Sequence, residues 1–190
     1  GSGAAFSGPR PDLSYRPGGG NARSWDKIYW EGKHLLGNLL DIEVPIIAAV
    51  NGPALRHCEI PLLSDIVLAA VQGMFKDSAH FPNGRVPGDG MPVVMPLLLG
   101  PNRGRYFLLT GQSLSASEAL NLGLVAEVMP LSELMPRARE LARQLLLQPP
   151  LTLRYSRVAM THDLKRRMHD LLGYGLALEG LGTLDNPEQV

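Results

Sequence analysis

The stretch Pro45-Ile46-Ile47-Ala48-Ala49-Val50-Asn51-Gly52-Pro53-Ala54 decides the fold of this chain of 190 residues. Residues 44–50 form a short apolar run rich in β-branched side chains, which is typical of a strand buried within a parallel sheet. Asn51-Gly52-Pro53 then interrupts the strand, because proline cannot donate to a sheet and an Asn-Gly pair favours a turn. The sequence therefore predicts a buried strand that ends in a sharp turn.

Strands and helices alternate on both sides of this stretch. Helical spacing covers residues 25–40, with Ser24 as the expected N-cap, and Ser115 followed by Glu118 forms a capping-box pattern. The other expected elements are a short helix at 59–64, strands at 66–70, from 74 and at 124–129, and helices at 92–99, 102–110, 115–121, 131–147 and 151–184. Such alternation predicts an α/β fold.

The bulk composition suits one globular domain with a sizeable core. Hydrophobic residues make up 45% and charged residues 19% of the chain, and the formal net charge is +0. We expect no nucleic-acid partner, because basic residues are not in excess. We also expect no membrane partner, because the apolar run at residues 44–50 is too short to span a bilayer. With a single cysteine, Cys58, no intrachain disulfide is possible. A cytoplasmic enzyme is the default interpretation, with the Gly- and Pro-rich residues 1–20 as a loop or disordered arm.

Three segments, in this order, resemble the crotonase (enoyl-CoA hydratase/isomerase) superfamily. They are residues 45–54, 64–70 and 75–111, and the family's usual continuation follows at 115–119 and 122–125. The resemblance covers about residues 25–180. It implies a crotonase-like ββα spiral core in residues 1–150 and a C-terminal helical trimerisation region in residues 151–190. Family members carry roughly one more ββα segment before the position of Gly1, so N-terminal strands are expected to be missing here.

Two departures from the CoA-dependent members point to a subgroup. The turn Ala54-Leu55-Arg56-His57-Cys58-Glu59 lacks the glycines whose backbone N–H groups help those members to hold a thioester oxyanion. His80 stands where hydratases place a catalytic glutamate, and Asp89 where they often have a small residue. Both features resemble the 6-oxocamphor hydrolase-like β-diketone hydrolases. That resemblance maps the acid and base residues onto His57, His80, Asp89 and Glu179.

Hydrolysis of a cyclic β-diketone is a reverse Claisen reaction, which needs a base for water and an acid for the departing enolate carbon. Histidine suits both tasks, because its ordinary pKa is about 6.5. We expect His80, oriented by Glu179, to activate water, and Asp89 with His57 to stabilise and protonate the enolate. The reaction needs neither metal nor cofactor. The expected substrate-binding residues are Trp30, Tyr29 and Phe81.

Ordinary structural roles remain open for most of these side chains. His57 could be a structural hydrogen-bonding group, Asp89 a turn residue and Glu179 an exposed residue on a helix face. Glu59 occupies the position of the second hydratase carboxylate, and could instead cap or pair near the start of its helix. Cys58 is expected to be inert.

Three functions therefore compete. The first is a cofactor-independent β-diketone hydrolase, and the second is an enoyl-CoA hydratase or isomerase, for which the basic run Lys165-Arg166-Arg167 could bind phosphates. The third is a non-catalytic assembly protein of the crotonase fold. Self-association as a homotrimer or a dimer of trimers is expected from the resemblance.

Overall fold

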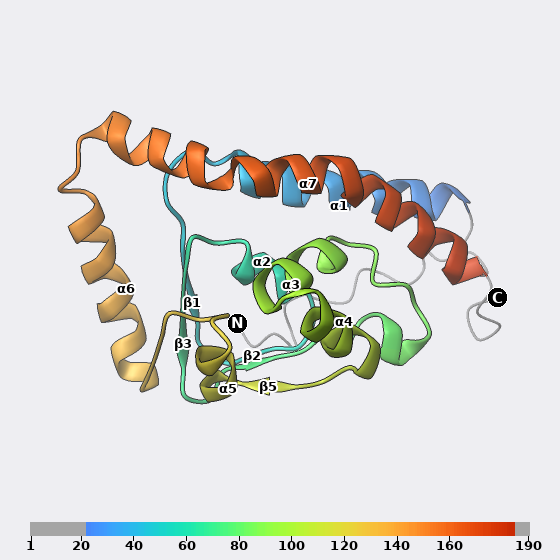
Figure 1. Cartoon of the computed structure of the whole chain (residues 1–190), viewed down its shortest axis with the longest axis horizontal. Coiled ribbons are helices and arrows are strands. Elements are labelled where there is room, and N and C mark those ends of the chain that lie inside the picture. The colour runs from blue at the N-terminus through green and yellow to red at the C-terminus, as the bar shows by residue number, and fades with distance from the viewer. Residues whose placement is uncertain (1–21, 185–190) are drawn as a thin grey trace.

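The computed structural model describes residues 22–184 and contains a three-stranded parallel sheet, two strands of which are labelled β1 and β3 in Figure 1. The strand order is β1 (Ile47–Val50), β3 (Ile66–Ala70) and β6 (Glu127–Met129). Ile47 pairs with Ile66 at one end of the β1–β3 ladder, and Leu68 pairs with Glu127 in the β3–β6 ladder. Both parallel connections contain a helix, as a parallel sheet requires.

A second small sheet continues from the first through the Asn51-Gly52 turn. Its strands β2 (Pro53–Ala54) and β4 (Met74–Phe75) are parallel, and β5 (Leu114–Ser115) runs antiparallel to β4. Short helices cover these strands. They are α2 (Glu59–Leu62), the 3₁₀ helix η2 (Phe81–Asn83), α3 (Met91–Leu99), α4 (Pro101–Thr110) and α5 (Ala116–Asn121).

Two long helices lie side by side across one face of the molecule (Figure 1). They are α1 (Ala22–Asp41) and the 35-residue α7 (Pro150–Leu184), which α6 (Leu131–Leu145) precedes. Leu36 and Leu40 of α1 join Met168, Leu172 and Leu176 of α7 in the main hydrophobic core. Because α7 also packs against α3, this helical layer closes the core from one side.

The predicted elements agree with the structure except at some boundaries. The α/β class is confirmed, the strand Ile66–Ala70 is as expected, and Ser115 and Glu118 form the predicted capping box. The prediction of Ser24 as an N-cap is wrong, since α1 already includes Ala22. The strand predicted at 44–50 begins at Ile47, because the N–H of Ile46 donates to the Asp65 side chain instead of to a strand.

Two sequence predictions lie outside the described residues, namely the N-terminal arm at 1–20 and the missing N-terminal strands. The proposed division at residue 150 stays a prediction, although α7 begins there. Among residues 22–184, no helix has the length and apolar character needed to cross a bilayer.

One buried ion pair joins the long helix to the sheet. Arg157 of α7 is 1% exposed, and its Nε donates to Oδ2 of Asp65 at 2.7 Å. Its Nη1 donates to the backbone carbonyl groups of Leu40 and Ile42 at the end of α1. The same Asp65 oxygen accepts the N–H of Ile46 at 2.6 Å. This cluster therefore fixes the ends of α1, β1 and β3 against α7.

Arg157→Ala should lower the free energy of unfolding by about 3–5 kcal/mol, because it leaves the Asp65 carboxylate without its buried partner. Urea denaturation followed by circular dichroism would measure this loss. Arg154→Ala is the matched control, since Arg154 and its partner Glu43 are each about half exposed, and such pairs contribute about 0–1 kcal/mol. Equal losses in the two variants would contradict the anchoring role of Arg157.

Candidate active site

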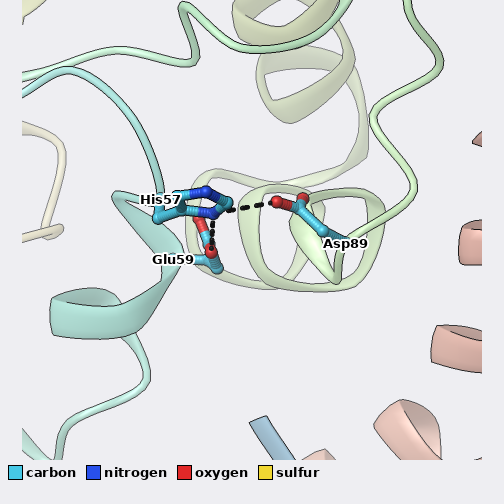
Figure 2. Close-up of side chains that lie close together, drawn as sticks. All are labelled: His57, Glu59 and Asp89. Atoms are coloured by element: carbon cyan, nitrogen blue, oxygen red, sulfur yellow. Dashed lines mark hydrogen bonds and ion pairs between the residues drawn. The ribbon is translucent and has the colours of Figure 1, made fainter. Parts of the chain in front are cut away.

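His57 lies in the turn between β2 and α2, in a backbone conformation that side chains other than glycine rarely adopt. Its φ is 55°, the one positive φ of a residue other than glycine in the described chain. Histidine is among the residues that tolerate this left-handed region. The turn directs the imidazole toward Glu59 and Asp89 (Figure 2).

The Nδ1 atom of His57 faces two carboxylates at once (Figure 2). It lies 3.1 Å from Oε1 of Glu59 and 3.1 Å from Oδ2 of Asp89. Hydrogen bonds to Asp89 and then to Glu59 are the largest causes that raise the pKa of His57 to about 10. His57 is therefore an imidazolium at neutral pH. Its single Nδ1–H donates to Oε1 of Glu59, while Oδ2 of Asp89 faces the same positive charge as an ion pair.

His80 lies in the loop after β4, and a carboxylate that sequence reasoning missed orients it. Its Nδ1 is 2.7 Å from Oδ1 of Asp77, a residue that is 1% exposed. Its Nε2 lies 3.4 Å from Oδ2 of Asp89 and 3.6 Å from Oε1 of Glu179. With Asp77 as the acceptor at Nδ1, the other ring nitrogen is directed at the two remaining carboxyl groups.

The pKa of His80 reflects opposing effects. Burial is the largest and lowers it, but the hydrogen bond to Asp77 and the charges of Asp89, Asp77 and Glu179 together raise the pKa to about 9. Burial is also the largest cause that raises the pKa of Glu179 to about 7 and that of Glu59 to about 7. Each of these groups can exchange a proton near the physiological range.

Charge balance explains why the pKa values of Glu59 and Glu179 are raised. Four carboxyl groups surround two imidazoles, so full ionisation would leave an excess of negative charge in a site that is mostly buried. A like charge nearby disfavours ionisation, as does burial. The site thus contains both protonated and ionised groups within hydrogen-bonding reach, as general acid–base chemistry requires.

A close backbone contact brings Asp89 and Glu179 together. A Cβ built on Gly88 would lie 2.3 Å from the carbonyl oxygen of Gly175 and 2.7 Å from Cβ of Glu179. A Cβ on Gly175 would lie 2.5 Å from the carbonyl oxygen of Gly88. Two glycines therefore allow the loop that carries Asp89 to pack directly on α7, one turn from Glu179.

The structure thus brings together the four predicted acid and base residues, His57, His80, Asp89 and Glu179. It adds Glu59, for which pairing near the helix start was one interpretation, and Asp77, which was not expected. Asp77 lies three residues before His80, and that spacing is a possible sequence signal for a carboxylate that orients the ring.

Two of the predicted substrate-binding residues lie in a separate cavity, and the third is next to His80 in the sequence. Tyr29 and Trp30 line a cavity of about 450 Å³ between α1 and α7, with Trp25 beside them and none of the four acid and base residues in its lining. Phe81 follows His80 directly and is 48% exposed. A separate groove of about 380 Å³ along β1 reaches His57. The binding roles of Tyr29, Trp30 and Phe81 stay predictions.

The same cluster contains groups that could ligate a cation. His57 Nδ1 and one oxygen each of Glu59 and Asp89 lie within 4.8 Å of one another, and imidazole with carboxylate suits zinc. The short contacts between these atoms are equally explained by the hydrogen bond from His57 to Glu59 and the ion pair of His57 with Asp89. The expected absence of metal stays a prediction. Burial raises the pKa of Cys58 well above its ordinary value, which agrees with an inert thiol.

Residues 13–174 match the family described as enoyl-CoA hydratase/isomerase. The chain belongs to this family. The crotonase-like fold predicted from the sequence is therefore confirmed.

Two solved structures that resemble this chain have names that describe different reactions. A β-diketone hydrolase from the cyanobacterium Anabaena sp. PCC 7120, bound to (S)-3-oxocyclohexyl acetic acid, is 56% identical with a TM-score of 0.85, over 87% of this chain and 66% of that one. An enoyl-CoA hydratase/isomerase from Mycobacterium paratuberculosis is 29% identical with a TM-score of 0.77, over 86% of this chain and 65% of that one.

One curated relative has a name that indicates a CoA ester as its substrate. Carnitinyl-CoA dehydratase from Salmonella paratyphi A is 36% identical over 151 residues, which are 79% of this chain and 52% of the relative. The chain thus spans about half the length of the curated relatives it matches.

Gly88→Ala should push the Asp89 loop away from α7 and lower the pKa of His80 from about 9 toward its ordinary value, because two carboxyl groups retreat from Nε2. NMR titration of the imidazole signals in the ligand-free protein would measure the change. Gly37→Ala is the control, since a Cβ there meets nothing within 4 Å. A Gly88→Ala protein that titrates like the wild type would contradict the proposed packing role.

Proposed function

We propose that this protein hydrolyses a carbon–carbon bond of a cyclic β-diketone by a reverse Claisen reaction and releases a keto acid. The observation that carries the proposal is the pair of imidazoles joined through Oδ2 of Asp89, with Glu179 beside the second ring. Similarity to a β-diketone hydrolase whose bound ligand is itself a keto acid supports it.

In the first step, water attacks one carbonyl carbon of the substrate while Nε2 of His80 takes its proton. Asp77 holds the opposite ring nitrogen at 2.7 Å and so fixes the ring. Glu179, 3.6 Å from Nε2, assists this orientation. His80 must first lose the proton implied by its pKa of about 9, and Glu179, with a pKa of about 7, is the adjacent acceptor.

In the second step, the tetrahedral adduct collapses to a carboxylic acid and the carbon–carbon bond breaks, with its electron pair going to an enolate. The positive charge of His57 stabilises the enolate oxygen. Asp89 then protonates the enolate carbon. Its Oδ2 lies 3.4 Å from Nε2 of His80, so the proton taken from water can return through Asp89. One water molecule is consumed, and neither metal nor cofactor takes part.

Substrate binding and assembly follow from the same proposal. Tyr29, Trp30 and Phe81 would provide apolar surface around the substrate. The protein would assemble as a homotrimer or a dimer of trimers through the C-terminal helical region, where Leu151, Tyr155 and Met160 are exposed apolar side chains. A cytoplasmic location stays a prediction.

The second candidate is an enoyl-CoA hydratase or isomerase. The buried Glu59 favours it, since a pKa of about 7 suits a general acid or base. The basic run offers it little support, because Lys165 pairs with Asp41 at 2.7 Å and both arginines pair with Asp163. The third candidate, an assembly protein, requires no turnover at all.

A spectrophotometric screen of monocyclic and bicyclic β-diketones, with crotonyl-CoA alongside, would separate these candidates. We expect loss of diketone absorbance, a keto-acid product and unchanged rates after dialysis against a chelator. Turnover of crotonyl-CoA alone would contradict the proposal and move the chemistry to Glu59. Oligomer formation without turnover of either class would favour the assembly protein.

His80→Ala should lower diketone turnover by roughly 10²–10⁴-fold, the range for loss of a general base. His162→Ala on the exposed face of α7 is the matched control and should keep full activity. Steady-state kinetics of the two variants at one pH would decide, and equal rates would remove His80 from the mechanism.

The pH profile offers an independent test. Since the base must be neutral, kcat/KM should rise with pH up to about 9, the pKa of His80, and fall above about 10, where His57 loses its charge. Both limbs belong to the coupled cluster rather than to single residues. A rate that stays flat or falls between pH 7 and 9 would contradict the role of His80 as base.

A further inference from the structure

Glu59 is a buried carboxyl group whose hydrogen-bond partner among the side chains of residues 22–184 is His57, with the Asp89 carboxylate also nearby. It is the first residue of α2, is 1% exposed and lies beside the buried Cys58, Leu62 and Leu63. Its Oε1 is 3.1 Å from Nδ1 of His57, whereas no hydrogen-bond partner is found for Oε2 in the described part of the chain. Burying a carboxyl group is costly, and the contact with His57 offsets part of that cost.

The two carboxylates that face His57 differ in their other contacts. Glu59 reaches one imidazole, whereas Oδ2 of Asp89 lies between two, at 3.1 Å from Nδ1 of His57 and 3.4 Å from Nε2 of His80. Nδ1 of His57 carries only one hydrogen. The hydrogen bond from this Nδ1–H goes to Oε1 of Glu59, whereas Oδ2 of Asp89 faces the same atom only as an ion pair. When Asp89 takes up a proton that ion pair is lost, and Glu59 is left to hold the ring.

We propose that Glu59 is a positioning residue that holds the Nδ1–H of His57 while Asp89 carries and delivers a proton. The inference rests on the proposed function, because it assigns Asp89 the delivery step. As His80 passes its proton to Asp89, the Nδ1–H stays bonded to Glu59 and His57 keeps its charge and orientation. After Asp89 gives that proton to the enolate carbon, its carboxylate again forms an ion pair with His57. Glu59 gains and loses no proton in this cycle.

The first experiment follows the His57 imidazole by NMR titration in the ligand-free protein, so it needs no substrate. In the wild type the ring should titrate near 10. Glu59→Gln should lower that midpoint by roughly one unit or more, because one of two charged acceptors is lost. An intact Glu59→Gln protein whose His57 titrates as in the wild type would overturn the proposal.

Two further variants separate a specific effect of Glu59 on His57 from misfolding and from a general loss of negative charge. Glu59→Asp keeps the charge but withdraws it from Nδ1, so His57 should titrate lower here as well, and an unchanged midpoint counts against the proposal. Asp163→Asn removes an exposed carboxylate that pairs with Arg166 and Arg167 on α7. It should leave the His57 midpoint unchanged, and an equal shift in this control would show that Glu59 has no specific effect.

Kinetics then separate positioning from a merely structural role. Glu59→Gln should reduce kcat by roughly 10–100-fold with little change in KM, as for other groups that orient a functional imidazole, and should move the alkaline limb of the pH profile to lower pH. Loss of active protein alone would lower the rate without moving that limb. If the wild type hydrolyses no β-diketone, the proposed function fails, while the titration still decides whether Glu59 holds His57.

Discussion

The contact between Gly88 and Gly175 is the constraint on which the rest of the site depends. Asp89 and Glu179 come from segments far apart in the sequence, and both must approach the same nitrogen of His80. Only two facing glycines allow the loop and α7 to meet this closely. The buried cluster around Arg157, nearer the N-terminus of the same helix, holds α7 in place relative to the sheet. The geometry of the candidate site is thus a result of helix placement.

Asp89 occupies the centre of the arrangement because one of its oxygens faces both imidazoles. Each ring has its own carboxylate in addition, Glu59 for His57 and Asp77 for His80. Glu59 and Asp77 therefore hold the two rings by contacts that do not involve Asp89. A family with a common fold can therefore host different chemistry when a few side chains at this point change, since function lies in the site and not in the fold.

Much of the fold could be predicted from local patterns, and the failures have physical reasons. The strand Ile66–Ala70 and the Ser115–Glu118 capping box were predictable because their signals are contained within a few residues. Strand β5 was not, because two residues show no periodicity. The four acid and base residues followed from resemblance, whereas Asp77 became evident only from its distance to His80. Pairings such as His80 with Asp89 depend on tertiary packing that no local pattern encodes.

The left-handed backbone of His57 has a consequence for the evolution of this turn. A residue other than glycine in a sparsely populated conformation costs on the order of 1–3 kcal/mol, and here that residue carries the imidazole. Replacement by glycine would relieve the backbone strain while removing the ring. Under the proposed function, the change that best stabilises this turn would therefore remove the imidazole that activity needs. The turn is a local case of a trade-off between stability and activity.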